Sequence, residues 1–186
     1  MYVPKILIKK RGIAWLITII AIIVSSIIGA GSSLNKLRQE AESIFYLGEE
    51  KDGAGIQHDL EMIMSDCYNL TVVASRYMNE NDKLISAVRK NREALSLAKT
   101  PGEKYRQAQN LLSSATELYI HLGDIHLSEK DNSFRSSLYA NINSHNIIIS
   151  RSTYNQHARE FNNILKSFPA NILSFVAFVS PLELYE

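Results

Sequence analysis

The stretch from Leu60 to Ala98 reads LEMIMSDCYNLTVVASRYMNENDKLISAVRKNREALSLA, and it carries the most regular pattern in the chain. Its side chains recur at alternating steps of three and four residues, the spacing of one face of an α-helix. The stripe consists of Leu60, Ile63, Cys67, Leu70, Ala74, Tyr77, Asn81, Leu84, Val88, Asn91, Leu95 and Ala98. This pattern predicts one helix of about 60 Å with a narrow seam, as in a bundle or coiled coil.

Three positions on the seam are not ordinary aliphatic side chains. Asn81 and Asn91 interrupt it, and we expect a structural role for them because polar seam residues commonly fix register or partner. Cys67 is the single cysteine, so no intrachain disulfide can form. Its place between Ile63 and Leu70 suits a small hydrophobe, so we expect it to pack in the core rather than act as a nucleophile.

Helical spacing also appears before and after this stripe. A short helix is predicted from Leu34 to Ile44, and the segment EEKDGAG at residues 49–55 is a polar loop. Thr100-Pro101-Gly102-Glu103 is typical of a helix start, with a threonine cap, a first-turn proline and a glutamate that bonds back to the cap. The helix after it has an apolar face broad enough to contact more than one neighbour.

A last long helix is predicted to start near Asn132 or Ser133 and to end at Phe168-Pro169. Its apolar stripe steps by five residues between Ile149 and Tyr154, which rotates the face. We expect the rotation to bring Arg151 or Asn155 toward neighbouring helices, where their polar atoms need partners; a structural role is favoured over a binding surface.

The N-terminal segment Gly12–Gly31 has no charged residue in twenty positions, which at about 1.5 Å each reach across roughly 30 Å of hydrocarbon. A buried core helix and a cleaved signal peptide ending at Gly29-Ala30-Gly31 are the alternatives; an uncleaved anchor is favoured because the apolar run is long. Lys5, Lys9, Lys10 and Arg11 precede it, so residues 1–11 are expected to be cytoplasmic, and residues from about 32 onward are expected on the outer side of the plasma membrane.

The predicted fold is therefore all-α: a transmembrane helix at 12–31, an antiparallel bundle of about four long helices at 32–168, and an apolar tail at 169–186. The net charge is +1, but the four cations of the first eleven residues leave the remaining chain at −3. A mildly acidic body argues against nucleic-acid binding, which requires a basic face.

The C-terminal third resembles a known family. Arg151, Tyr154-Asn155, Phe161-Asn162, Ser167-Phe168-Pro169 and Asn171 resemble the R..YN.....YN....SFP.N signature of LemA family proteins. The chain departs from the family pattern upstream, where Leu34 stands for a tyrosine and Tyr68 for a proline. The resemblance implies an N-terminal transmembrane helix and an extracytoplasmic or surface-exposed helical bundle. It implies no reaction.

No catalytic or metal-binding pattern stands out. The five histidines are not paired at three or four residues, no glutamate is followed by a histidine three residues later, and no serine lies in a Gly-x-Ser-x-Gly setting. We therefore expect no metal or cofactor and no enzymatic activity.

The strongest functional lead is the apolar tail, in which Phe175 and Phe178 are the candidate interface. The tail is too short to span a bilayer, so it packs on the bundle, lies at the membrane interface or meets another protein. The predicted function is a membrane-anchored interaction or scaffold module of a bacterial cell envelope, with a protein partner or a second copy. The alternative is a ligand-binding or sensor ectodomain that works through a partner.

Overall fold

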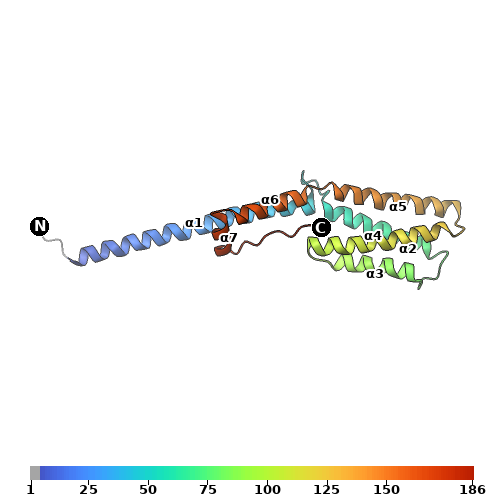
Figure 1. Ribbon diagram of the computed structural model, residues 1–186, viewed down its shortest axis with the longest axis horizontal. Helices are drawn as coiled ribbons and strands as arrows, with labels where there is room; N and C mark the ends of the chain where they lie inside the picture. The colour runs from blue at the N-terminus through green and yellow to red at the C-terminus, as the bar shows by residue number, and fades with distance from the viewer. Residues whose placement is uncertain (1–4) are drawn as a thin grey trace. The chain divides into compact units, whose positions relative to one another are not determined.

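The computed structural model describes residues 5–186, with side chains from residue 12 onward. Every regular element in this range is a helix (Figure 1), which confirms the predicted all-α class. The elements are α1 (Lys5–Leu47), α2 (Ile56–Ala74), α3 (Lys83–Leu97), α4 (Pro101–Gly123), α5 (Glu129–Ser150), α6 (Tyr154–Lys166) and α7 (Ala170–Val176). The side chains of the predicted basic N-terminus, residues 1–11, lie outside the described part.

The chain forms two compact units. One contains the chain up to Glu40 together with Glu160–Leu182, and the other contains Ala41–Arg159 together with Glu183–Glu186. In the second unit α2, α3, α4 and α5 lie side by side (Figure 1), with α2 against α3, α4 and α5, and α4 against α3 and α5. Aliphatic side chains fill the space between them. Fully or almost fully buried are Leu60, Ile63, Leu70, Val88, Leu95, Leu111, Leu118, Leu122 and Ile142.

Helix α1 continues through Gly29 and Gly31 without a break. The predicted short helix from Leu34 to Ile44 is therefore the C-terminal part of α1 and not a separate element. By length and composition α1 is able to cross a membrane, and none of its most apolar window is buried against the rest of the chain. An apolar helical window whose side chains are not buried against the protein matches a lipid environment better than a protein core.

The prediction of one helix from Leu60 to Ala98 is wrong, because the chain turns between α2 and α3. Asn79 accepts a hydrogen bond from the Asn81 amide at 2.9 Å, and Asp82 caps α3 by accepting from the Leu84 amide at 2.8 Å. Short polar side chains of this kind compete with helical backbone bonds and favour turns and caps. Asn81 therefore lies in the turn. Asn91 has a structural role, because its side-chain Nδ2 donates to Ser114 Oγ on α4 at 3.1 Å.

Helices α2 and α3 form an antiparallel hairpin around this turn. Arg92 Nε donates to the Met64 carbonyl at 3.1 Å, and the Arg92 guanidinium lies 5.1 Å from the centre of the Tyr68 ring. Cys67 is fully buried in the seam of α2, as the sequence predicts. Burial is the main cause that raises the pKa of its thiol to about 12, so the thiolate is disfavoured.

The predicted start of α4 is confirmed. Thr100 Oγ1 accepts from the Glu103 amide and Glu103 Oε2 accepts from the Thr100 amide, both at 3.3 Å, and Pro101 is the first helical residue. This capping box satisfies two amides that have no partner within the helix. The capping box therefore marks both the end of the loop after α3 and the first turn of α4.

The predicted helix from Asn132 to Phe168 is two helices, and it starts earlier than expected. Ser128 caps α5 by accepting from the Asp131 amide at 3.1 Å. The five-residue step in the apolar stripe marks a break at residues 151–153, where Ser152 Oγ accepts from the Tyr154 amide at 3.3 Å. A hydroxyl at this position supplies the bond that a preceding helical turn would have supplied.

Polar contacts join α2 to α5 within the bundle. His145 Nδ1 and Asp59 Oδ1 lie 2.7 Å apart, and the Asp66 carboxylate is hydrogen-bonded to Asn141. Asp66 Oδ2 is buried without a hydrogen-bond partner in the described part of the chain. A buried oxygen without a partner costs free energy, and desolvation raises the pKa of Asp66 despite opposing effects from His145 and Asn141.

Replacing this carboxylate by a neutral amide, Asp66→Asn, is expected to stabilise the bundle at neutral pH. Because the folded pKa lies above the unfolded one, the favourable contribution of Asp66 is present below the unfolded pKa and is lost as pH rises through the folded pKa. Thermal unfolding followed by circular dichroism should give a higher Tm for Asp66→Asn at pH 7, with the difference vanishing below about pH 4. The exposed Glu117→Gln should show no such trend. A lower Tm for Asp66→Asn at pH 7 would contradict the assignment.

Candidate functional site

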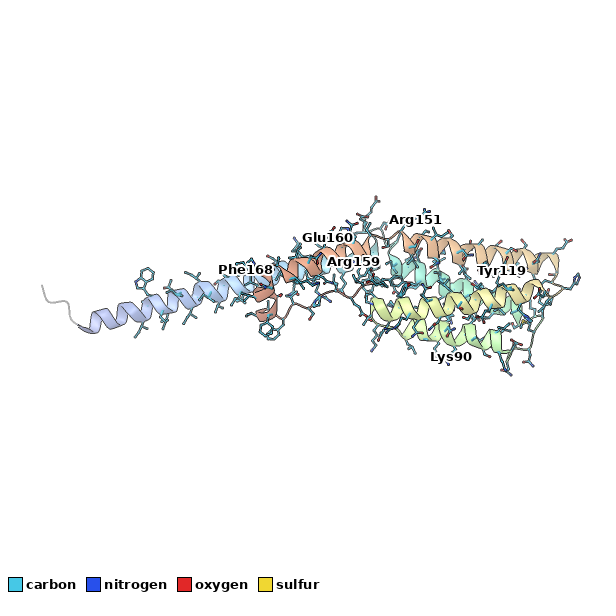
Figure 2. All side chains as sticks on the ribbon, in the orientation of Figure 1. Lys90, Tyr119, Arg151, Arg159, Glu160 and Phe168 are labelled. Carbon is cyan, nitrogen blue, oxygen red and sulfur yellow. The ribbon has the colours of Figure 1, made fainter. Side chains whose placement is uncertain are left out.

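Helix α6 carries most of the residues singled out in the sequence, and it is strongly two-sided. Tyr154, Ala158, Phe161 and Leu165 are buried at steps of three and four residues, so they share one face. Arg159 and Glu160, labelled in Figure 2, lie between them on α6. The helix therefore presents one apolar face and several polar side chains beside it.

Tyr154 is fully buried at the start of α6, in the second unit. Its ring lies edge-on to that of Phe45, with centroids 5.2 Å apart, and its hydroxyl donates to the Glu183 carbonyl at 2.6 Å. A buried tyrosine hydroxyl needs such a partner. This motif residue therefore contacts both the end of α1 and the last residues of the chain.

Asn155 binds the same segment through both the oxygen and the nitrogen of its side-chain amide. Its Oδ1 accepts from the Tyr185 amide at 2.8 Å, and its Nδ2 donates to the Tyr185 carbonyl at 2.9 Å. The Tyr185 ring packs edge-on against Tyr105 at 5.2 Å, and burial raises the pKa of its hydroxyl. Arg159 forms an ion pair with Glu186 beside it.

Asn162 repeats this arrangement in the first unit. Its Oδ1 accepts from the Leu182 amide and its Nδ2 donates to the Leu182 carbonyl, both at 2.8 Å. We call these two pairs, Asn155 with Tyr185 and Asn162 with Leu182, the amide clamps. In each clamp an asparagine side chain forms one hydrogen bond to the backbone N–H and one to the backbone carbonyl of the same tail residue, as a neighbouring β-strand would do.

The spacing of the clamps fits a helix beside an extended chain. Asn155 and Asn162 are seven residues apart on α6, a rise of about 10.5 Å, and Leu182 and Tyr185 are three residues apart, which an extended chain covers in about 10 Å. The described residues after Phe178 form no regular element, so their backbone groups need partners from elsewhere. The two asparagines supply four of those bonds.

The other predicted motif residues take simpler positions. Arg151 caps the C-terminus of α5 and is exposed (Figure 2), whereas Phe161 is buried. Asn171 Oδ1 accepts from the Ile172 amide at 2.9 Å in the first turn of α7, directly after Pro169, which follows a cis peptide bond. Of the polar residues grouped by sequence, Asn155 and Asn162 reach the tail and Arg151 does not share in these clamps.

The tail, residues 169–186, is divided between buried and exposed side chains. Val179, Leu182 and Tyr185 are buried, while Phe175 is 82% and Phe178 is 92% exposed. The tail therefore packs on the protein through Val179, Leu182 and Tyr185, whereas the two candidate interface residues do not pack on it. Leu182 and Glu183 were not singled out in the sequence; the available signal was the asparagine pair at a seven-residue step.

A small polar pocket adjoins the first clamp in the second unit. It has a volume of about 290 Å³, and its wall includes Tyr105, Asn146, Asn155 and Tyr185. Hydroxyl and amide groups offer hydrogen bonds to a small polar ligand. Among the described residues, no group of three or more His, Cys, Asp or Glu side chains is placed to hold a metal ion.

Removing the clamp amides is expected to free the tail. Asn155→Ala and Asn162→Ala each remove two hydrogen bonds, a loss of about 1–3 kcal/mol because the freed backbone groups stay partly buried. Hydrogen exchange should then show faster exchange of the Tyr185 and Leu182 amides respectively. The neighbouring exposed Asn163→Ala is the matched control and should leave both amides protected. Unchanged exchange in the two clamp variants would contradict the geometry.

The family model described as the LemA family matches residues 54–186, which is most of the chain and includes α2 to α7. No curated protein and no solved structure matches the chain. The matched range includes both amide clamps, and it confirms the resemblance seen in the motif. The chain belongs to the LemA family.

Proposed function

We propose that this protein is a membrane-anchored, non-enzymatic helical bundle that acts as an interaction or scaffold module of a bacterial cell envelope. Helix α1 supports the anchor, since it is long and apolar enough to cross a membrane. The four cations of residues 1–11 favour a cytoplasmic N-terminus and an extracytoplasmic bundle. The single cysteine supports a non-enzymatic role, because its thiol is buried and held protonated.

The observation that carries the interaction role is a groove between α2 and α5. It has a volume of about 240 Å³ and is lined by Asn69, Val72, Val73, Arg76, Phe134 and Leu138. Val72 and Phe134 are exposed apolar side chains on its surface. A groove between two helices with apolar walls suits an amphipathic helix of a partner protein.

Hydrogen bonds and an ion pair around Asp131 hold one end of the groove together. Tyr77 Oη donates to Asp131 Oδ2 at 2.6 Å and accepts from the Ser128 amide at 3.1 Å, and Arg76 forms an ion pair with Asp131. The hydrogen bond from Tyr77, followed by those from Ser128 and Arg76, lowers the pKa of Asp131. The carboxylate therefore ties the end of α2 to the start of α5 at neutral pH, so the groove is preformed.

A photo-crosslinking side chain tests this role in native membranes. Placed at Phe134 in the full-length chain, it should capture a discrete protein, and the same side chain at the exposed Ile120 on α4 should not. Val72→Asp should lower the capture at residue 134 about tenfold or more, since a charge at the centre of an apolar contact is costly. Equal capture from both positions, or from neither, would contradict the interaction role.

A ligand-binding or sensor ectodomain is the second candidate, favoured by the polar pocket beside Asn155 and Tyr185. A volume of about 290 Å³ admits only a small ligand. A metabolite that occupies it at a hundred times its Kd should stabilise the fold by about 2.7 kcal/mol, seen as a raised Tm. Asn146→Leu at the pocket wall should abolish that shift. A broad screen without a shift in the unmodified protein would contradict this candidate.

A further inference from the structure

The first unit exposes an unusually apolar face on α7 and its flanks. Phe175 and Phe178 are almost fully exposed, Phe168 is 80% exposed, and Ile172 and Val176 are also exposed. Ile172, Phe175 and Val176 are spaced by three and four residues, so they share one side of α7. Ser174, in contrast, is buried. A soluble helix has the opposite arrangement, with its polar side outward.

The same segment has no charge. From Ser167 to Leu182 there is no Asp, Glu, Lys or Arg, and the nearest charged residues are Lys166 and Glu183 at its two ends. Water solvates a segment of this composition poorly, and a contiguous exposed apolar surface marks an interaction site. An aqueous surface is therefore an unfavourable place for these aromatic rings.

The place along α1 where this segment packs indicates which environment its exposed apolar face meets. A Cβ atom at Gly31 would lie 2.8 Å from Cβ of Ala177, so the tail just after α7 approaches α1 closely at Gly31. Arg38 Nε donates to the Ser180 carbonyl at 3.2 Å, seven residues further along α1. Gly31 ends the uncharged apolar run of α1, and Lys36 is the first charged residue after it. The phenylalanines next to Ala177 therefore lie where α1 leaves the hydrocarbon.

We propose that α7, with Phe168 and Phe178 at its flanks, is a second membrane contact whose aromatic rings enter the interfacial region of the bilayer crossed by α1. The segment is too short to span a bilayer, and its exposed face is apolar and aromatic, as in segments that lie in the interface plane. Lys166, the charged residue that precedes the segment, has a side chain long enough to reach the headgroups. The contact fixes the tail at the membrane surface through residues separate from the bundle groove.

Tryptophan fluorescence in lipid vesicles tests this contact in the full-length protein. Trp15 is the single tryptophan and lies in α1, so Phe175→Trp and Phe178→Trp are each made in a Trp15→Phe background. The proteins are reconstituted in phosphatidylethanolamine and phosphatidylglycerol vesicles that carry lipids brominated either near the headgroup or near the end of the acyl chain. Ile120→Trp in the same background is the control, and unmodified Trp15 reports insertion of α1.

Tryptophan at 175 and at 178 is expected to emit at shorter wavelength than at 120 and to be quenched several-fold more, most strongly by bromine near the headgroup. Emission and quenching equal to those at position 120 would overturn the proposal. Tryptophans that stay unquenched in vesicles but shift to shorter wavelength in native membranes would indicate a protein partner and would also overturn it. An unquenched Trp15 would remove the inserted α1 on which the contact depends, with the same consequence; none of these outcomes bears on capture at Phe134.

Discussion

The structure depends most on how the backbone of an extended tail is satisfied in an all-helical protein. A helix satisfies its own amides and carbonyls, whereas an extended segment has to find partners outside itself. Here Asn155 and Asn162 on α6 each bind both backbone groups of one tail residue, at 2.8–2.9 Å for Tyr185 and 2.8 Å for Leu182. Each compact unit contains one of these clamps, so the final residues are structural in both.

The clamps give the family motif a physical meaning. Tyrosine and asparagine side chains in a motif could belong to a catalytic or binding site. Here the polar atoms of Tyr154, Asn155 and Asn162 instead form hydrogen bonds to the main chain. Tyr154 donates to the Glu183 carbonyl, and Asn155 and Asn162 have both amide atoms engaged. The clamped residues Leu182 and Tyr185 are buried, whereas Phe175 and Phe178 earlier in the tail remain exposed. The tyrosine and asparagines of the motif thus hold the end of the tail, while Phe168 of the same motif stays exposed.

The sequence predicted correctly that the chain is helical, but it predicted only some of the helix ends. Particular residues show why. The capping box at Thr100 and Glu103 was predictable because its donors and acceptors lie three residues apart. The turn after α2 was missed because the apolar stripe of three- and four-residue steps continues across it in the sequence. The break after α5 left a signal, the five-residue step from Ile149 to Tyr154, but that step was interpreted as a rotation of the apolar face along one helix. Asn79, Asp82 and Ser152 end or start helices there with local hydrogen bonds, and each is equally compatible with an exposed helical position.

The sequence by itself determined the all-α class, the N-terminal segment long and apolar enough to cross a membrane, and the buried place of Cys67, because periodicity and hydrophobic length are local properties of the chain. Only the tertiary structure decided which backbone groups Asn155 and Asn162 bind, and which phenylalanines stay exposed. Leu182 is twenty residues from Asn162 and Tyr185 is thirty from Asn155. A hydrogen-bond partner at that separation is chosen by how the helices pack, and spacing along the sequence does not encode it.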